Sequence, residues 1–169
     1  LWGGAHLLQD DYLVVCLTNG NRKVRREEFE NVMVDTNDKG LILSYPDKIG
    51  SIKAEWGPWE ESIERDLETI IGYKEWENVV THNEKGEYGH IHHIKPHELA
   101  AKAYESTKCT AKRYYSGDYY VVDRLPDELE SVNKDLYKAK RAVARKYKSQ
   151  IKTLRRLYHM MPYELWKDS

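Results

Sequence analysis

Residues 12–20 of the chain, YLVVCLTNG, join a run of apolar side chains to an Asn-Gly pair. A short apolar run that is bounded by a turn signal predicts a β-strand. Because Asn19-Gly20 is the strongest short hairpin signal, we expect the charged segment 22–29 to return beside it as an edge strand. With the further strand LILSY at 41–45, the first 55 residues are predicted to form a small antiparallel sheet.

A helix is predicted after Pro58, because proline is well tolerated at the first helical position. Two further hairpins are expected at 76–94 and 111–122, with a short helix that starts at Pro96 between them. The predicted class is therefore α+β, with small antiparallel hairpins and short helices. The apolar residues of the first helix form one face, and they are Ile63, Leu67, Ile70 and Ile71.

A long C-terminal helix is predicted from Pro126, because apolar residues recur every three or four positions until Pro162 ends the pattern. About 35 residues at the helical rise span ~50 Å, which is longer than the rest of a small domain can cover. We therefore expect two parts. They are an acidic α+β body at 1–125 and a basic amphipathic helix at 126–162 that packs on this body or extends from it.

The charge of the chain is distributed very unevenly. Residues 134–156 hold ten Lys or Arg side chains and one acidic residue, Asp135, although the whole chain has a formal net charge of −1. The remainder is acidic, above all the helical stretch EESIERDLE at 60–68. Such asymmetry is typical of proteins that bind a polyanion or a partner of complementary charge.

The basic side chains of the predicted C-terminal helix form a stripe beside its apolar face. Such a stripe can follow the phosphates of DNA, and the alternatives are a solvated face or a contact with the acidic body. A membrane partner is not expected, since the segment has no Trp or Phe to insert. The predicted nucleic-acid-binding residues are Lys138, Arg141, Arg145, Lys148, Lys152 and Arg155.

Five of the seven histidines lie within sixteen residues, at positions 82, 90, 92, 93 and 97. Alternate residues of a strand share a face, so His90 and His92 form a plausible pair of metal ligands. The simpler interpretation is a polar strand face with solvated imidazoles, since no Cys or carboxylate has an obvious ligand spacing. We therefore expect no cofactor, with one divalent metal as the alternative.

Residues 92–96, HHIKP, resemble the first motif of the HNH, or His-Me finger, nucleases. The resemblance implies a ββα core in which one of His92 and His93 acts as the general base while a neighbouring residue ligates a divalent metal. The Asn and the further His of that family have no suitably spaced equivalents after Pro96. The expected core is therefore degenerate, and an HNH-type DNA endonuclease is the alternative function.

The stretch 11–35, DYLVVCLTNGNRKVRREEFENVMVD, resembles phage-encoded inhibitors that bind the staphylococcal housekeeping sigma factor of RNA polymerase. That resemblance implies a non-enzymatic protein of host takeover, which inhibits or redirects host transcription at selected promoters. A non-catalytic DNA-binding protein is the second alternative. The expected location is the cytoplasm of an infected bacterium, because Cys16 and Cys109 form no CxxC pair and indicate no disulfide framework, which suits a reducing compartment. The host, the partner-contact residues and the oligomeric state stay open.

Overall fold

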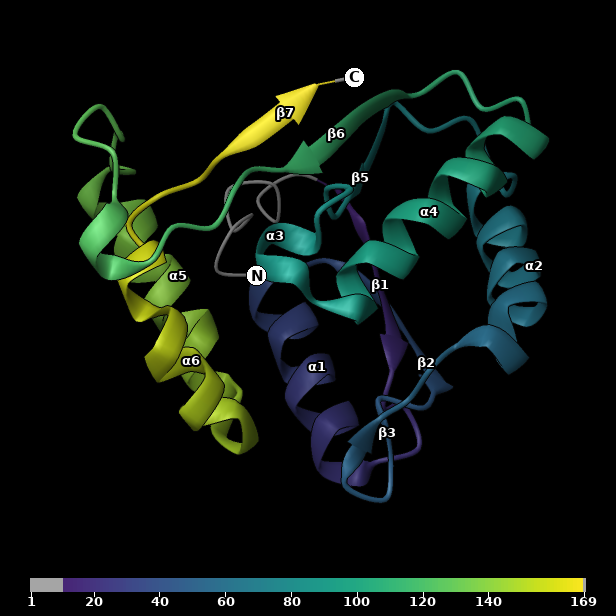
Figure 1. Cartoon of the computed structure of the whole chain (residues 1–169), viewed down its shortest axis with the longest axis horizontal. Helices are drawn as coiled ribbons and strands as arrows, with labels where there is room; N and C mark the ends of the chain where they lie inside the picture. The colour runs from purple at the N-terminus through teal and green to yellow at the C-terminus, as the bar shows by residue number, and fades with distance from the viewer. Residues whose placement is uncertain (1–10, 169) are drawn as a thin grey trace. The chain divides into compact units, whose positions relative to one another are not determined.

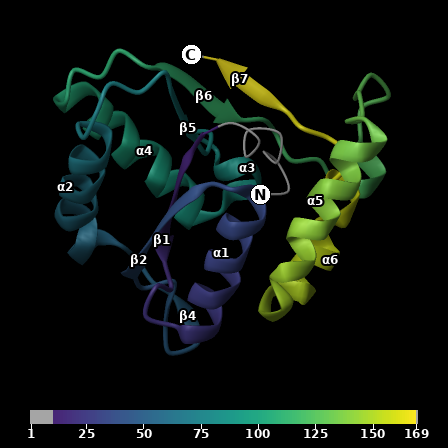
Figure 2. The same cartoon turned by 180° about the vertical axis from the view of Figure 1, so that it is seen from behind.

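The computed structural model describes residues 11–168 and divides the chain into two compact units, whose elements Figures 1 and 2 show from opposite sides. The first unit comprises the chain up to Pro46 together with Tyr120–Glu164. The second comprises the intervening residues and the terminal segment from Leu165. This division differs from the expected boundary at residue 125, because the C-terminal helices contact the first helix of the chain.

The first unit begins with a β–α–β crossover. It is formed by β1 (Leu13–Thr18), α1 (Lys23–Thr36) and β2 (Lys39–Tyr45). The two strands pair in parallel, with Val15 opposite Leu41. A parallel pair cannot be joined by a two-residue turn, so the chain between the strands has to cross over, and here it does so as a helix.

The antiparallel hairpin predicted at Asn19-Gly20 is therefore wrong. Asn19 takes a left-handed φ of +68°, and after a short turn the chain enters α1 instead of the expected edge strand at 22–29. The apolar side chains of segment 23–36 have helical spacing, and this segment forms a helix in spite of the hairpin signal at Asn19-Gly20. The buried apolar residues stand at positions i, i+3 and i+4 of the helix, and they are Phe29, Val32 and Met33.

These three residues form the core of the first unit. They pack against partly buried side chains from both strands and from the C-terminal segment, namely Val14, Cys16, Ile42, Val143 and Tyr147. Gly40 lies directly against this core. A Cβ at Gly40 would lie 2.5 Å from Cγ of Met33 and 2.5 Å from Cε1 of Phe29, so glycine allows the close approach of α1 to β2.

The single long helix predicted from Pro126 is wrong, because the C-terminal segment is broken at Tyr147. Tyr147 leaves the helical region, with φ and ψ of −82° and 62°. Glu28 of α1 fixes the break, since its carboxylate accepts hydrogen bonds from the backbone N–H of Ser149 at 2.6 Å and from its hydroxyl at 2.7 Å. The pieces are η3 (Val122–Arg124), α5 (Lys134–Lys146), η4 (Lys148–Gln150), α6 (Ile151–Leu157) and η5 (Tyr158–Met160).

Lys140 belongs to the basic segment but does not face solvent. Its side chain is 0% exposed, and Nζ lies 3.1 Å from the carboxylate of Glu164 and 3.0 Å from the carbonyl oxygen of Tyr163. Burial lowers the pKa of Lys140 to about 8. The carboxylate of Glu164 acts in the opposite direction, because an adjacent negative charge favours the ammonium form. The pair therefore holds α5 to the chain that follows η5.

The second unit contains a short hairpin, two main helices and a three-stranded sheet. β3 and β4 form the antiparallel hairpin, and the sheet has the order β5-β6-β7. β5 and β6 are parallel, whereas β7 is antiparallel to β6. The elements are β3 (Lys48–Ile49), β4 (Ile52–Lys53), η2 (Gly57–Trp59), α2 (Glu60–Ile71), β5 (Asn78–Thr81), α3 (Gly86–Gly89), α4 (Ile91–Ser106), β6 (Lys112–Ser116) and β7 (Trp166–Asp168).

The helix predicted after Pro58 is confirmed as α2. Three of its predicted apolar positions, Ile63, Leu67 and Ile71, are buried. Ile70 is only partly buried. α2 lies beside α4 in both views (Figures 1 and 2) and makes the most extensive helix–helix contact of the described residues with it. The amphipathic pattern of the sequence therefore identified this packing face correctly.

The hairpins predicted at 76–94 and 111–122 are wrong. β5 pairs with β6 rather than with the residues that follow it, and α3 and α4 form the connection between these two strands. The HHIKP segment lies at the beginning of α4, after the single turn of α3, and not in a strand. The predicted HNH-like core is thus not found in residues 11–168. The mixed α+β class with small sheets is confirmed for this range. Within it, no helix has the length and apolar character that crossing a membrane requires.

Candidate metal and catalytic site

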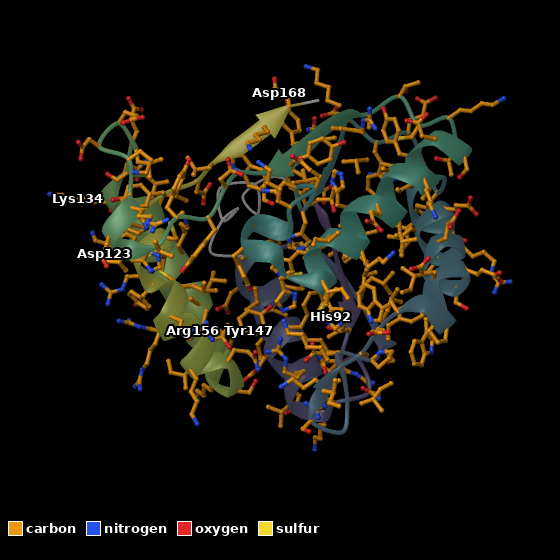
Figure 3. The ribbon with its side chains drawn as sticks, viewed as in Figure 1. His92, Asp123, Lys134, Tyr147, Arg156 and Asp168 are labelled. Atoms are coloured by element: carbon orange, nitrogen blue, oxygen red, sulfur yellow. The ribbon has the colours of Figure 1, made fainter. Side chains whose placement is uncertain are left out.

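Several histidines and one glutamate meet where β5 leads through α3 into α4. His82 follows the end of β5, Glu87 lies in α3, and His90 is the N-cap of α4. His93 lies in the first turn of α4, next to His92, which Figure 3 labels near the start of this helix. These side chains come together because α3 is only one turn long and reverses the chain sharply.

Glu87 joins two of the imidazoles. Its Oε1 lies 3.0 Å from Nδ1 of His82, and its Oε2 accepts a hydrogen bond from Nδ1 of His93. The side chain of Glu87 is only 7% exposed. An ionised carboxylate accepts hydrogen bonds and donates none, so the hydrogen of each neutral ring resides on Nδ1. Each ring then keeps the lone pair on Nε2, which is available to a metal ion or a proton.

The rings of His82 and His93 lie on top of each other. Their centroids are 3.9 Å apart and their planes differ by 12°. Both Nδ1 atoms bond to Glu87, so Nε2 is the ring nitrogen that each histidine has left for another partner. Among the described residues, neither Nε2 atom has a hydrogen-bond partner. The arrangement therefore presents two neighbouring imidazole lone pairs.

The electrostatics of the cluster fix its protonation. Burial alone would raise the pKa of Glu87, but hydrogen bonds from His82 and His93, with that of Ser116, outweigh it and hold this pKa well below its ordinary value. Burial lowers the pKa of His93, and the hydrogen bond to Glu87 opposes this effect without cancelling it. At neutral pH the cluster thus has an ionised carboxylate and a neutral His93, the protonation states that metal binding requires.

His90 offers a hydrogen-bond donor rather than a lone pair. Its Nδ1 accepts a hydrogen bond from the backbone N–H of His92 at 3.2 Å, which caps α4. The hydrogen of the neutral ring is therefore on Nε2. Burial, together with the charges of His93 and Lys53, lowers the pKa of His90 to about 4, so the ring is neutral at pH 7. Its centroid lies 4.5 Å from that of His93.

Asn83 fixes the loop that carries Glu87. Its side chain is almost completely buried, and Oδ1 accepts hydrogen bonds from the backbone N–H groups of Lys85 and Glu87, both at 3.0 Å. Its Nδ2 donates to the carbonyl oxygens of Ser116 and Gly117. The hydroxyl of Ser116 also donates to Glu87. The loop is thereby tied to the end of β6.

The backbone of Glu87 is strained, with φ and ψ of 58° and −59°. A residue other than glycine rarely adopts a positive φ. The preceding Gly86 has a φ of +60°, and a Cβ there would lie 2.8 Å from Cγ1 of Ile94. Strained backbone is concentrated at functional sites and persists only where surrounding contacts hold it. The hydrogen bonds of Asn83 supply such contacts.

His92 and its neighbours have a different environment from the one predicted. The ring of His92 is buried and stacks on Trp56 at 4.5 Å, while Nε2 donates to the carbonyl oxygen of Ala54 at 2.8 Å. Its Nδ1 lies 3.3 Å from the carboxylate of Asp47. The predicted pair of His90 and His92 has ring centroids 5.7 Å apart, and neither residue belongs to the compact group of donors that the structure brings together.

That compact group consists of His82, Glu87 and His93, whose possible ligand atoms all lie within 4.8 Å of one another. The sequence pattern does not single out Glu87, because the predicted hairpin makes it one of many acidic residues in a strand. The signal that was available is a carboxylate between two histidines of one loop, at spacings of five and six residues. Of the residues predicted for catalysis, only His93 is in the group.

The predicted nucleic-acid-binding residues lie in the first unit, on α5, η4 and α6. Two of them have partners there, since Lys138 lies 3.2 Å from Asp135 and Arg141 donates to the hydroxyl of Tyr158 at 3.0 Å. The side chains of the other four, Arg145, Lys148, Lys152 and Arg155, are exposed. Figure 3 labels two further basic residues of this segment, Lys134 and Arg156. Their function stays a prediction.

Comparison with known proteins gives one curated relative and several solved structures. No family model matches the chain. The relative is the uncharacterised protein L374 of Acanthamoeba polyphaga mimivirus, which is 28% identical over 110 residues. The match covers 55% of this chain and 47% of the viral protein. The chain thus spans about half the length of the curated relative that it matches.

The similar solved structures are enzymes. The 4-carboxy-2-hydroxymuconate hydratase GalB of Pseudomonas putida KT2440 superimposes with a TM-score of 0.65 at 16% identity, over 94% of this chain and 78% of its own. A deacetylase of teicoplanin biosynthesis superimposes with a TM-score of 0.66 at 17% identity, over 89% of this chain and 80% of its own. The zinc-inhibited form of teicoplanin deacetylase Orf2 superimposes with a TM-score of 0.65 at 15% identity, over 89% of this chain and 80% of its own. At these identities the similarity shows a shared fold.

These structures correct the functional expectations from the sequence. The predicted sigma-factor-binding regulator, with its keywords of transcription inhibition and host takeover, is wrong, because the fold is that of a hydratase and of deacetylases. The HNH nuclease and the non-catalytic DNA-binding protein are overturned on the same ground. The expectation of a non-enzyme is wrong for this reason too.

Proposed function

We propose that this chain is part of a metal-dependent hydrolase that removes acetyl groups from amines, with its metal site at His82, Glu87 and His93. The main support is that Glu87 bonds to Nδ1 of both stacked imidazoles and leaves the Nε2 atom of each ring for a metal ion. Three of the similar solved structures are deacetylases, which supports the choice of reaction.

The donor set fits a zinc-like ion. Neutral imidazole nitrogen and carboxylate oxygen are ligands that zinc accepts, and a metal-binding histidine commonly donates its other ring N–H to a carboxylate. His82 and His93 would hold the ion through Nε2, and Glu87 would orient both rings. Catalytic zinc sites usually have three protein ligands, so the proposal requires one further ligand beyond this pair. The fit of these donors to zinc supports the predicted alternative of one divalent metal over the expectation of no cofactor.

The proposed reaction is the hydrolysis of an N-acetyl group, in which His90 also has a role. Water adds to the acetyl carbon, the C–N bond breaks, and the amine leaves with a proton as acetate forms. A bound zinc ion would polarise the acetyl oxygen and lower the pKa of water. His90 is a neutral ring whose Nε2–H donates, so it is suited to hydrogen-bond the acetyl oxygen as negative charge develops there.

Zinc binding by the full chain tests this function. Isothermal titration calorimetry is expected to show one zinc site in the wild-type protein and at least tenfold weaker binding in His93→Ala and His82→Ala. His159→Ala is the matched control, because this histidine lies in the first unit and bonds to the carbonyl oxygen of Tyr120. Zinc-dependent release of acetate from a panel of N-acetylated amines then tests the reaction. Equal zinc affinity in all four proteins would overturn the proposal.

A further inference from the structure

The β3–β4 hairpin of the second unit is small and strongly amphipathic. Its arms pair Lys48 with Lys53 and Ile49 with Ile52, and Gly50 makes the turn with a φ of +63°. Residues that are directly opposite in an antiparallel pair share a face, and successive residues alternate between faces. The two isoleucines therefore lie on one face of the hairpin and the two lysines on the other.

Both faces lack partners in the described structure. Ile49 is 59% exposed and Ile52 is 75% exposed, which is unusual for side chains of this size. The two lysines are exposed as well, and neither lies within ion-pair distance of a carboxylate among residues 11–168. Like charges that are directly opposite destabilise a strand pair. The hairpin thus combines an uncovered apolar face with an uncompensated pair of positive charges.

His92 holds this hairpin next to the candidate site. Its ring bonds to the carbonyl oxygen of Ala54 and lies 3.3 Å from Asp47, so it contacts the residues just before and just after the hairpin. The backbone N–H of Ala54 also donates to the carbonyl oxygen of Asp47 at 3.0 Å, which closes the stem. Since His92 stands between His90 and His93 in the chain, the hairpin lies beside the histidine cluster. The charge of Lys53 lowers the pKa of both His90 and His93, which agrees with this position.

We propose that the β3–β4 hairpin docks on an anionic phospholipid surface, where Ile49 and Ile52 enter the apolar layer and Lys48 and Lys53 contact lipid phosphates. Charge complementarity supports this partner, because lysine pairs with phosphate and neither Lys48 nor Lys53 forms an ion pair with a carboxylate of residues 11–168. The small area of the hairpin also supports a lipid partner over a protein partner. A stable protein–protein interface buries at least about 1,000 Å², whereas a shallow membrane contact needs only a few apolar side chains beside basic ones.

This surface is independent of the basic segment 134–156. The expectation of no membrane partner was based on that segment, which has no Trp or Phe. The hairpin supplies apolar side chains from a different unit and goes beyond the proposed reaction. If both proposals hold, the histidine cluster works close to a lipid surface.

Co-sedimentation of the full chain with vesicles tests the proposal. The wild-type protein is expected to bind vesicles that contain phosphatidylserine and not vesicles of phosphatidylcholine alone. Ile49→Ser with Ile52→Ser, and separately Lys48→Glu with Lys53→Glu, should each weaken binding at least tenfold. Val24→Ser with Val34→Ser is the apolar control, because these exposed valines lie on α1 of the first unit. Arg155→Glu with Arg156→Glu is the basic control.

A direct insertion readout complements the binding data. Tryptophan in Ile52→Trp should be quenched by brominated lipid in anionic vesicles, whereas that in Val34→Trp should not. Binding that is lost in the Arg155/Arg156 variant and kept in both hairpin variants would overturn the proposal, as would self-association of the wild-type chain that the isoleucine variant abolishes. None of these measurements needs metal or turnover. A failure here therefore leaves the zinc site standing, and a failure of the zinc site leaves this surface standing.

Discussion

Nδ1 of His82 lies 3.0 Å from Oε1 of Glu87, and the other oxygen of this carboxylate accepts a hydrogen bond from His93. One buried anion therefore sets the tautomer of two imidazoles at once. A neutral acceptor would not do this equally well, because hydrogen bonds to an ionised carboxylate are roughly twice as strong as those between neutral groups.

Glu87→Gln is expected to weaken zinc binding by about 10- to 100-fold, the usual effect of removing a carboxylate that orients a metal-binding histidine. The amide has nearly the same shape, but it can turn an N–H towards one of the rings. Calorimetric titration with zinc measures the change. Glu84→Gln is the matched control, since Glu84 lies in the same loop and is exposed. Equal affinities of the two variants would contradict this role of Glu87.

Asn83→Ala is expected to destabilise the protein by several kcal/mol, because buried groups that lose a hydrogen bond cost about 1–3 kcal/mol each. Four hydrogen bonds of its side chain would disappear together. Urea unfolding at pH 7.5 gives the free energy of unfolding. Asn31→Ala, at an exposed position of α1, should change it little. A loss of similar size in both variants would argue against the loop-fixing role of Asn83.

Lys140→Met is expected to lower the free energy of unfolding by about 3–5 kcal/mol, because it leaves the carboxylate of Glu164 buried without its cation. The double variant Lys140→Met with Glu164→Leu should recover most of this loss, since no uncompensated charge remains. A double-mutant cycle of thermal or urea unfolding measures the coupling. Strictly additive effects of the two single substitutions would show that the buried pair does not act as a unit.

The stability of the protein is expected to fall as the pH decreases from about 6.5 towards 4. The folded pKa of His90 is about 4 and that of His93 is also lowered, so the unfolded chain binds more protons in this interval. Stability is therefore highest above the unfolded pKa of histidine. Urea midpoints at four values of pH between 7.5 and 4.5 give the slope. His90→Asn should flatten it, because Asn remains a good N-cap but does not titrate. An unchanged slope would contradict the lowered pKa of His90.

Much of the local structure could be predicted from the sequence. The strand predicted at 12–17, the strand at 41–45 and the amphipathic helix after Pro58 are all present, because each depends on a pattern within a few neighbouring residues. The concentration of histidine near the functional cluster was also visible. His93 is among the site residues that the sequence predicts, whereas Glu87 and His82 are not.

The errors share one physical cause. The Asn-Gly turn at 19–20 and the long apolar repeat after Pro126 are local signals. The helical spacing of 23–36 and the parallel pairing of β1 with β2 overrode the first, and a distant contact overrode the second. Glu28 meets Ser149 across 121 residues and ends the C-terminal helix at Tyr147. The parallel pairing of β5 with β6 places Ser116 against the loop at Glu87, 29 residues away.

The sequence by itself thus determined the mixed class, the helical face of α2 and the uneven distribution of charge and histidine. Those properties follow from side-chain periodicity and composition, which act along the chain. Only the tertiary structure decided which strands pair, where the last helix breaks and which imidazoles share one carboxylate. These features depend on burial and on hydrogen bonds between residues far apart in the chain, and no local pattern encodes such distances.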